Sequence, residues 1–169
     1  ARACTGAALD RWARAADETA RKLAKLQDGT DLLCGSADSF IARPASADSL
    51  CSLAASNPEA AIVAGATDVG LWITKQMREL PRIILVGGVE ELRRISDKQD
   101  RLSIGAATTY AEAQAQLAGL HPDIGEVLRR IGSRQVRASG TVGGNIANGS
   151  PIGDMPPMLL GLLRWSVAF

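Results

Sequence analysis

The sequence has 169 residues, enough for one ordinary domain or for a fragment of a larger protein and too few for two full-sized domains. Hydrophobic residues make up 46% and charged residues 22%, as in soluble globular proteins, which argues against a disordered or fibrous chain. The 19 Lys and Arg residues nearly balance 18 Asp and Glu residues, and aromatic residues make up 4%, so nucleic acid is not expected as a partner.

The cysteine and histidine content argues against a disulfide framework and against a metal site. Cys4, Cys34 and Cys51 are widely spaced and form no CxxC pair, which suits a reducing compartment. The single histidine, His121, cannot supply a His-rich ligand set, and it precedes Pro122 in a turn where we expect it on the surface. Because no apolar stretch has membrane-spanning length, we expect a cytoplasmic protein without a membrane anchor.

The amino-terminal part is expected to be one amphipathic helix followed by a linker. Apolar residues such as Trp12 and Leu23 recur at near-helical spacing, which predicts a helix over 7–26. Residues 27–39 are rich in small polar residues and turn formers, which indicates a linker. The main domain is therefore expected to begin near Phe40.

The next segments predict a parallel α/β unit. Ser46 indicates the cap of a first helix, and the apolar run 61–64 indicates a buried strand. Thr67 indicates the cap of a second helix that closes before Pro81, and 82–86 indicates a second strand. Two strands joined by such a helix lie parallel, with ligands expected at their carboxyl ends.

Shorter elements are expected to complete the domain. The pattern predicts a short helix over 90–95, a strand over 102–105, and helices over 109–117 and 122–131. We therefore expect an α/β domain over 40–160, with a small parallel sheet first, a mixed sheet after it and flanking helices.

The turn after the first of these strands is the first candidate binding site. Gly65 ends the strand and Thr67 begins a helix, so free backbone N–H groups and the positive end of a helix dipole converge on a point that suits a phosphate. An ordinary turn of an α/β unit needs the same residues, and this alternative stays open. Asp68 repels an anion unless it bonds to a hydroxyl, which favours a sugar as its partner.

The glycine-rich run 139–157 is the second candidate site. Six glycines lie between Gly132 and Gly153, a density that weakens helices and strands and favours close approach of the backbone to a ligand. The run contains neither a Walker loop nor the G-x-G-x-x-G fingerprint, and the alternative is a long loop of ordinary turns. Interleaved hydroxyl and amide side chains suit a pyrophosphate and a polyol chain: Thr141, Asn145, Asn148 and Ser150.

These two stretches, in this order and at this separation, resemble the FAD-binding domain of the molybdenum hydroxylases. That family includes xanthine dehydrogenase, aldehyde oxidase and the medium subunit of carbon monoxide dehydrogenase. The resemblance covers about 40–160, and 135–157 is similar to the family signature almost residue for residue. Residues 145–148, with Ser150 and Pro151, are more similar to xanthine dehydrogenase small subunits than to carbon monoxide dehydrogenases. The resemblance implies an FAD-binding domain of the PCMH type.

The resemblance also implies which residues bind FAD. The turn 64–69 and the segment 141–145 would hold the pyrophosphate, and Asp154 would bond to the ribityl hydroxyls. Asp154 also fits a plain helix cap, because a short helix is expected to follow it. No catalytic residue and no metal ligand is nominated, since the cofactor carries the chemistry. The implied FAD-binding residues are Ala64, Gly65, Ala66, Thr67, Asp68, Val69, Thr141, Gly143, Gly144, Asn145, Ser150 and Asp154.

Both ends of the sequence depart from the family pattern. Cys4-Thr5-Gly6 is similar to the end of the iron–sulfur motif that precedes this domain in fused small subunits, but the other cluster ligands are absent. Residues 1–39 are therefore expected to be a helix and linker without a cluster. Residues 161–169 match no family pattern, and Leu163 and Trp165 would form an exposed apolar end unless packed. These departures predict a truncated flavin domain.

The function implied by the resemblance is electron transfer. FAD would accept electrons from iron–sulfur centres that are reduced at a molybdopterin-binding large subunit, and it would pass a hydride to NAD. The [2Fe-2S] clusters and the molybdopterin would lie on other domains or subunits. Two alternatives stay open: a truncated, non-catalytic flavin-domain remnant, and an FAD-dependent reductase of the same fold.

Overall fold

A computed structural model describes residues 10–26, 28–98, 101–150 and 153–161. The chain divides into two compact units, Ala1–Thr30 and Asp31–Phe169, and each is described by itself. Cys4 and the tail residues Leu163 and Trp165 lie outside the described residues, so the expectations for them stay predictions.

The first unit contains helix α1, Arg11–Ala24, which confirms the expected amphipathic helix within the described residues. It begins after Asp10, whose carboxylate accepts hydrogen bonds of 2.8 Å from the backbone N–H groups of Trp12 and Ala13. No residue of α1 is buried, and the side chain of Trp12 is 71% exposed. In the described part of the chain, no helix is long and apolar enough to cross a membrane.

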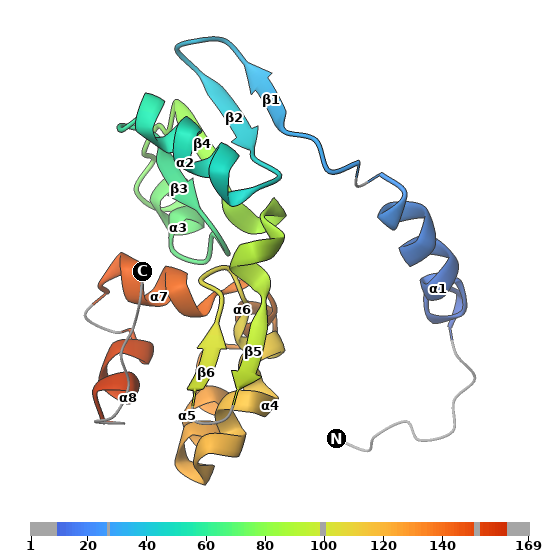
Figure 1. Ribbon diagram of the computed structural model, residues 1–169, viewed down its shortest axis with the longest axis vertical. Coiled ribbons are helices and arrows are strands. Elements are labelled where there is room, and N and C mark those ends of the chain that lie inside the picture. Colours follow the sequence, from blue (N-terminus) through green and yellow to red (C-terminus); the bar gives the residue numbers. More distant parts are fainter. Residues whose placement is uncertain (1–9, 27, 99–100, 151–152, 162–169) are drawn as a thin grey trace. The chain divides into compact units, whose positions relative to one another are not determined.

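The second unit begins with a four-stranded sheet whose order is β1-β2-β4-β3 (Figure 1). Strand β1 is antiparallel to β2, whereas β2 and β3 both run parallel to β4, as expected for strands joined by a crossover helix. Residues 27–39 contain β1, so the interpretation of this segment as a linker was wrong in part. The first sheet is mixed, whereas a parallel sheet was expected. The strands are β1 Leu32–Gly35, β2 Phe40–Arg43, β3 Ala61–Val63 and β4 Arg82–Leu85.

Helix α2, Ala47–Ser56, covers one face of this sheet. Its cap is the expected one, since the Ser46 hydroxyl accepts a hydrogen bond from the Ser49 N–H at 3.1 Å. A small core of Phe40, Ala42 and Ile84 lies beneath the helix. Strand β3 is the edge of the sheet, so Ile62 is 59% exposed and the prediction of a buried strand was wrong for that residue.

Among the remaining elements, β5 and β6 form an antiparallel pair, where a mixed sheet was expected. The expected helix over 90–95 is a single 3-10 turn followed by a strand that the pattern did not predict. The bounds of these elements are α3 Val69–Thr74, η1 Val86–Gly88, η2 Glu90–Arg93, β5 Ile95–Lys98, β6 Arg101–Ile104, α4 Tyr110–Leu120, α5 Pro122–Arg130, α6 Arg134–Ser139, α7 Val142–Asn148 and α8 Met155–Gly161.

The main core lies among α4, α5, α7 and α8. Leu117, Leu128 and Met155 are at most 2% exposed and belong to one apolar cluster. His121 caps α5, because its Nδ1 accepts a hydrogen bond from the Asp123 N–H at 3.2 Å, and it lies at the surface as expected. The α/β fold class predicted from the sequence is confirmed.

The glycine-rich run 139–157 contains two helices, which excludes the alternative of a long loop of ordinary turns and confirms the short helix expected after Asp154. Helix α7 passes through Gly143 and Gly144, and α8 follows a short connection. At Gly143 the closest neighbour is another segment of the chain. An added Cβ on Gly143 would lie 2.5 Å from the Ala106 Cβ, so the segment before α4 and α7 are in direct contact.

Candidate functional site

The turn between β3 and α3 carries a set of unused hydrogen-bond donors. Within the described residues, no acceptor bonds to the backbone N–H groups of residues 65–69. Ala66 has a φ of 57°, an uncommon left-handed conformation for a residue with a Cβ, and such strain is found mainly where it serves a site. Successive free N–H groups around a left-handed residue form a concavity that binds anions.

The cap predicted at Thr67 is wrong. Helix α3 begins at Val69 and ends at Thr74, well before Pro81, and its N-cap position is Asp68, whose side chain makes no capping hydrogen bond. Thr67 is exposed in the turn. The helix has only six residues, so its dipole is small. Anion binding by this segment would therefore depend on the N–H donors of the turn and not on the helix dipole.

The start of α7 behaves differently from the turn. Its backbone N–H groups all have partners within the chain: Gly143 donates to Ala106 at 3.0 Å, Gly144 to the Thr141 hydroxyl at 3.1 Å, and Asn145 to the Thr141 carbonyl at 3.1 Å. Gly143 thus has a reason within the chain for lacking a side chain, and the expectation that it also approaches a ligand stays a prediction. What this segment can offer a ligand is its side chains and its shape.

The two candidate stretches face one another, as expected of two segments that would hold one pyrophosphate. An added Cβ on Gly65 would lie 2.0 Å from the Ser139 carbonyl oxygen, so the turn touches the end of α6. The Asn148 amide donates a hydrogen bond of 2.7 Å to the Asp68 carboxylate, which ties α7 to the turn. A bridge between Thr109 and Thr141 joins the starts of α4 and α7.

A cavity of about 220 Å³ opens where these segments meet. Its walls are small or carry hydroxyl groups, apart from one arginine, and the volume matches part of a dinucleotide rather than a whole one. The lining residues are Ala64, Gly87, Arg93, Ala107, Thr109, Ser139 and Thr141.

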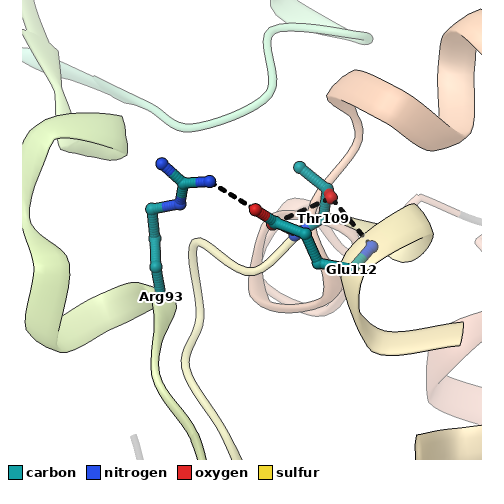
Figure 2. Close-up of polar contacts among 3 residues, drawn as sticks. All are labelled: Arg93, Thr109 and Glu112. Carbon is teal, nitrogen blue, oxygen red and sulfur yellow. Dashed lines mark hydrogen bonds and ion pairs between the residues drawn. The ribbon is translucent and has the colours of Figure 1, made fainter. Parts of the chain in front are cut away.

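Arg93 is held at the cavity by a polar network (Figure 2). Its guanidinium donates to one carboxylate oxygen of Glu112, while the other oxygen accepts hydrogen bonds of 2.9 Å from the N–H and the hydroxyl of Thr109. The Thr109 hydroxyl in turn accepts from the Glu112 N–H, which completes a capping box at the start of α4. Hydrogen bonds from Thr109 and the neighbouring Arg93 lower the pKa of Glu112.

The lowered pKa of Glu112 predicts a dependence of stability on acid pH. A carboxyl whose pKa is lower in the folded state stabilises the fold above its unfolded pKa, and the contribution disappears as pH falls through the folded pKa. We expect Glu112→Gln to lower the free energy of unfolding by about 1 kcal/mol or less near pH 7, because solvent screens the ion pair with Arg93. Near pH 3 the variant and the parent should have the same free energy of unfolding. Urea unfolding at several pH values measures this difference, and a constant gap down to pH 3 contradicts it.

Asp154 lies immediately before α8 and cannot act as an ordinary cap. A capping side chain accepts from the N–H of the second or third helical residue, and these positions are Pro156 and Pro157, which have no N–H. Within the described residues, no hydrogen bond or ion pair engages the Asp154 carboxylate, and the residue is exposed. This geometry disfavours the capping alternative.

Two further predicted residues, Asn145 and Ser150, lie in α7 and between α7 and α8. The Asn145 amide oxygen accepts a hydrogen bond from the Met155 N–H at 3.1 Å, so Asn145 fixes the start of α8. The Tyr110 hydroxyl is buried without a hydrogen-bond partner in the described part of the chain, and burial, followed by the charges of Asp154 and Asp68, raises the pKa of Tyr110. Ser150, between α7 and α8, is half-buried.

The sequence model of a protein family, the FAD binding domain in molybdopterin dehydrogenase, matches residues 35–163. The chain belongs to this family. It is homologous to the flavin-binding domains of molybdopterin-dependent oxidoreductases, and the expectation drawn from the glycine-rich signature is confirmed at that level.

Individual relatives agree with this assignment. The chain is 30% identical over 128 residues to xanthine dehydrogenase of Drosophila subobscura, covering 69% of this chain and 10% of that protein. It is 28% identical over 123 residues to the nicotine 6-hydroxylase medium subunit of Paenarthrobacter nicotinovorans, covering 72% and 44%. A structure of reconstituted CO dehydrogenase from Oligotropha carboxidovorans matches with a TM-score of 0.63 and 29% identity, covering 74% and 44%. The chain thus spans a tenth of the xanthine dehydrogenase and less than half of the two shorter proteins.

Several residues at the cleft were missed by sequence reasoning. Arg93 and Thr109 line the cavity, yet neither lies in either candidate stretch. Ser139 also lines it and begins the glycine-rich run 139–157, but it was not named as a binding residue. Their positions depend on tertiary contacts, which no local pattern carries. For Asp154 the signal was present, because the prolines that exclude a cap stand next to it in the sequence.

Proposed function

We propose that this chain binds FAD at the cleft between the β3–α3 turn and α7. The proposal extends to the role of electron-transfer flavin unit in a xanthine dehydrogenase-like molybdenum hydroxylase, with NAD as acceptor. Its partners would be a molybdopterin-binding large subunit and an iron–sulfur domain. The exposed free thiols of Cys34 and Cys51 suit a cytoplasmic setting.

One observation carries the proposal: the turn whose N–H groups at 65–69 have no partner among the described residues contacts α6 and α7 directly, and Ala64 at its start lines one cavity with Thr141. Backbone donors of this kind suit a diphosphate, and the nearby Thr141 region closes the opposite wall. Asp154 adds a carboxylate that has no partner among the described residues, a strong acceptor for neutral hydroxyls such as those of a ribityl chain. The donors, the acceptor and the small wall residues fit parts of a flavin dinucleotide.

The chain's own residues would bind and orient the cofactor. Bound FAD supplies the chemistry that couples one-electron iron–sulfur centres to two-electron hydride transfer. The turn would hold the diphosphate, Asp154 would hold a hydroxyl chain, and the contact between Asp68 and Asn148 would keep the two walls at a fixed separation. None of these residues needs to act as an acid, base or nucleophile.

Titration with FAD tests this proposal through the quenching of flavin fluorescence. We expect the parent chain to bind FAD and to become yellow, and Asp154→Asn to bind about tenfold more weakly, the effect of one charge-assisted hydrogen bond. Asp97→Asn, at an exposed position in β5, is the matched control and should bind like the parent.

Each failure has a distinct meaning. A parent chain that stays colourless in excess FAD contradicts the proposed function and supports the non-catalytic remnant. If Asp154→Asn binds FAD as tightly as the parent, Asp154 is not part of the site, and the proposal that the chain binds FAD still stands.

A further inference from the structure

We propose that Arg93 binds the diphosphate of the flavin dinucleotide and is the cationic side chain of the cleft. The proposal rests on the proposed function and extends it, since the family signature in the sequence placed the diphosphate against the turn and α7 only. Arg93 lies at the end of η2, on neither of those segments.

The position of Arg93 is the first support. It lines the same cavity as Ala64 and Thr141, which stand at the two segments that the sequence assigned to the diphosphate. The six other lining residues are uncharged. A ligand that enters this cavity therefore lies beside Ala64, the residue at which the turn begins, and beside a guanidinium.

The charge balance of the cleft is the second support. Asp68 and Asp154 both act on the Tyr110 hydroxyl electrostatically, so both carboxylates lie near the site. A diphosphate brings further negative charge, and two like charges at about 4 Å repel by about 1 kcal/mol even in water. Helices α3 and α7 have six and seven residues, too short to offset this charge by their dipoles. The cleft therefore needs a full positive charge.

The orientation of the guanidinium is the third support. Glu112 is fixed by its capping box with Thr109, and it holds one terminal nitrogen of Arg93. Figure 2 shows the second terminal nitrogen directed away from Glu112. An arginine has five N–H donors, and among the described residues Glu112 is the one partner of Arg93, so donors remain for phosphate oxygens. Glu112 thus orients the guanidinium of Arg93 and leaves several of its N–H donors available.

Two variants that break the same ion pair separate a binding role from a structural one. Arg93→Ala removes the cation and the pair, whereas Glu112→Gln removes the pair and keeps the cation. We expect Arg93→Ala to weaken FAD binding about tenfold or more, with a smaller dependence of affinity on salt. Glu112→Gln leaves the cation in the cleft but no longer fixes it, so it should weaken FAD binding by less than Arg93→Ala does. Arg129→Ala, which breaks an exposed ion pair with Glu126 in α5, is a matched control for loss of an arginine.

The readouts are FAD affinity from fluorescence titration at low and high salt and the melting temperature of each FAD-free variant. Equal loss of affinity in Arg93→Ala and Glu112→Gln, or no loss in either, overturns the role of Arg93 while the proposed function stands. Failure of the parent to bind FAD overturns both. If Arg93→Ala does not fold, Arg93→Lys keeps a charge at the position and is expected to retain more affinity than Arg93→Gln.

Discussion

Gly65→Ala is expected to destabilise the second unit by about 3 kcal/mol or more, before any effect on a ligand is considered. An added Cβ would lie 2.0 Å from the carbonyl oxygen of Ser139 and 2.9 Å from the Cα of Gly140. Both are backbone atoms, so no side-chain rotation relieves the overlap, and the β3–α3 turn must separate from the end of α6. Thermal or urea unfolding of the FAD-free protein measures the loss.

Gly70→Ala is the control for this prediction. Gly70 lies in α3, and no atom outside its own helix comes within 4 Å of an added Cβ. Alanine in a helix is favoured over glycine by about 0.5–1 kcal/mol, so this variant should be slightly more stable than the parent. If Gly65→Ala unfolds like the parent and loses only FAD affinity, the glycine serves the ligand and the contact with Ser139 is not essential.

Met155→Ala is expected to cost about 2–5 kcal/mol, the range for truncating a large buried side chain. Met155 is 0% exposed and joins α8 to the cluster that contains Leu117 and Leu128. Because Asp154 precedes it, loosening α8 should also displace that carboxylate from the cleft. The variant should therefore lose stability and FAD affinity together, as measured by unfolding and by titration.

Met77→Ala makes the same chemical change at a position that is 78% exposed. It should alter the free energy of unfolding by less than about 0.5 kcal/mol and leave FAD affinity unchanged. A loss of stability as large as that of Met155→Ala would contradict the role given to α8 in the core.

The elements with strong local signals were predictable from the sequence. The Ser46 cap, the parallel pairing of β3 and β4, and the helices that became α4 and α5 follow from capping residues and apolar spacing. Strand β1 was not predictable in this way, because all four of its residues are exposed and its sequence Leu-Leu-Cys-Gly has no alternation. Its pairing with β2 determines it, and pairing is a tertiary property.

The candidate site was likewise predictable from the sequence only in part. We expected Gly65 and the α7 segment to face each other, but the contact with Ser139 that requires a glycine at position 65 was not predicted. High glycine density indicates close backbone approach, but it does not distinguish a ligand from another part of the chain. Arg93 could not be found, since its place at the cavity depends on Glu112, which lies 19 positions away.

The hydrogen bond from Asn148 to Asp68 joins residues that are 80 positions apart. Closing so large a span costs chain entropy, and contacts of long sequence separation slow folding. By contrast, α4 and α5 are neighbours along the chain and pack together through nearby residues. Refolding should therefore restore helical secondary structure first and the closed cleft last, so a kinetic intermediate of this protein would be helical and yet unable to retain a nucleotide.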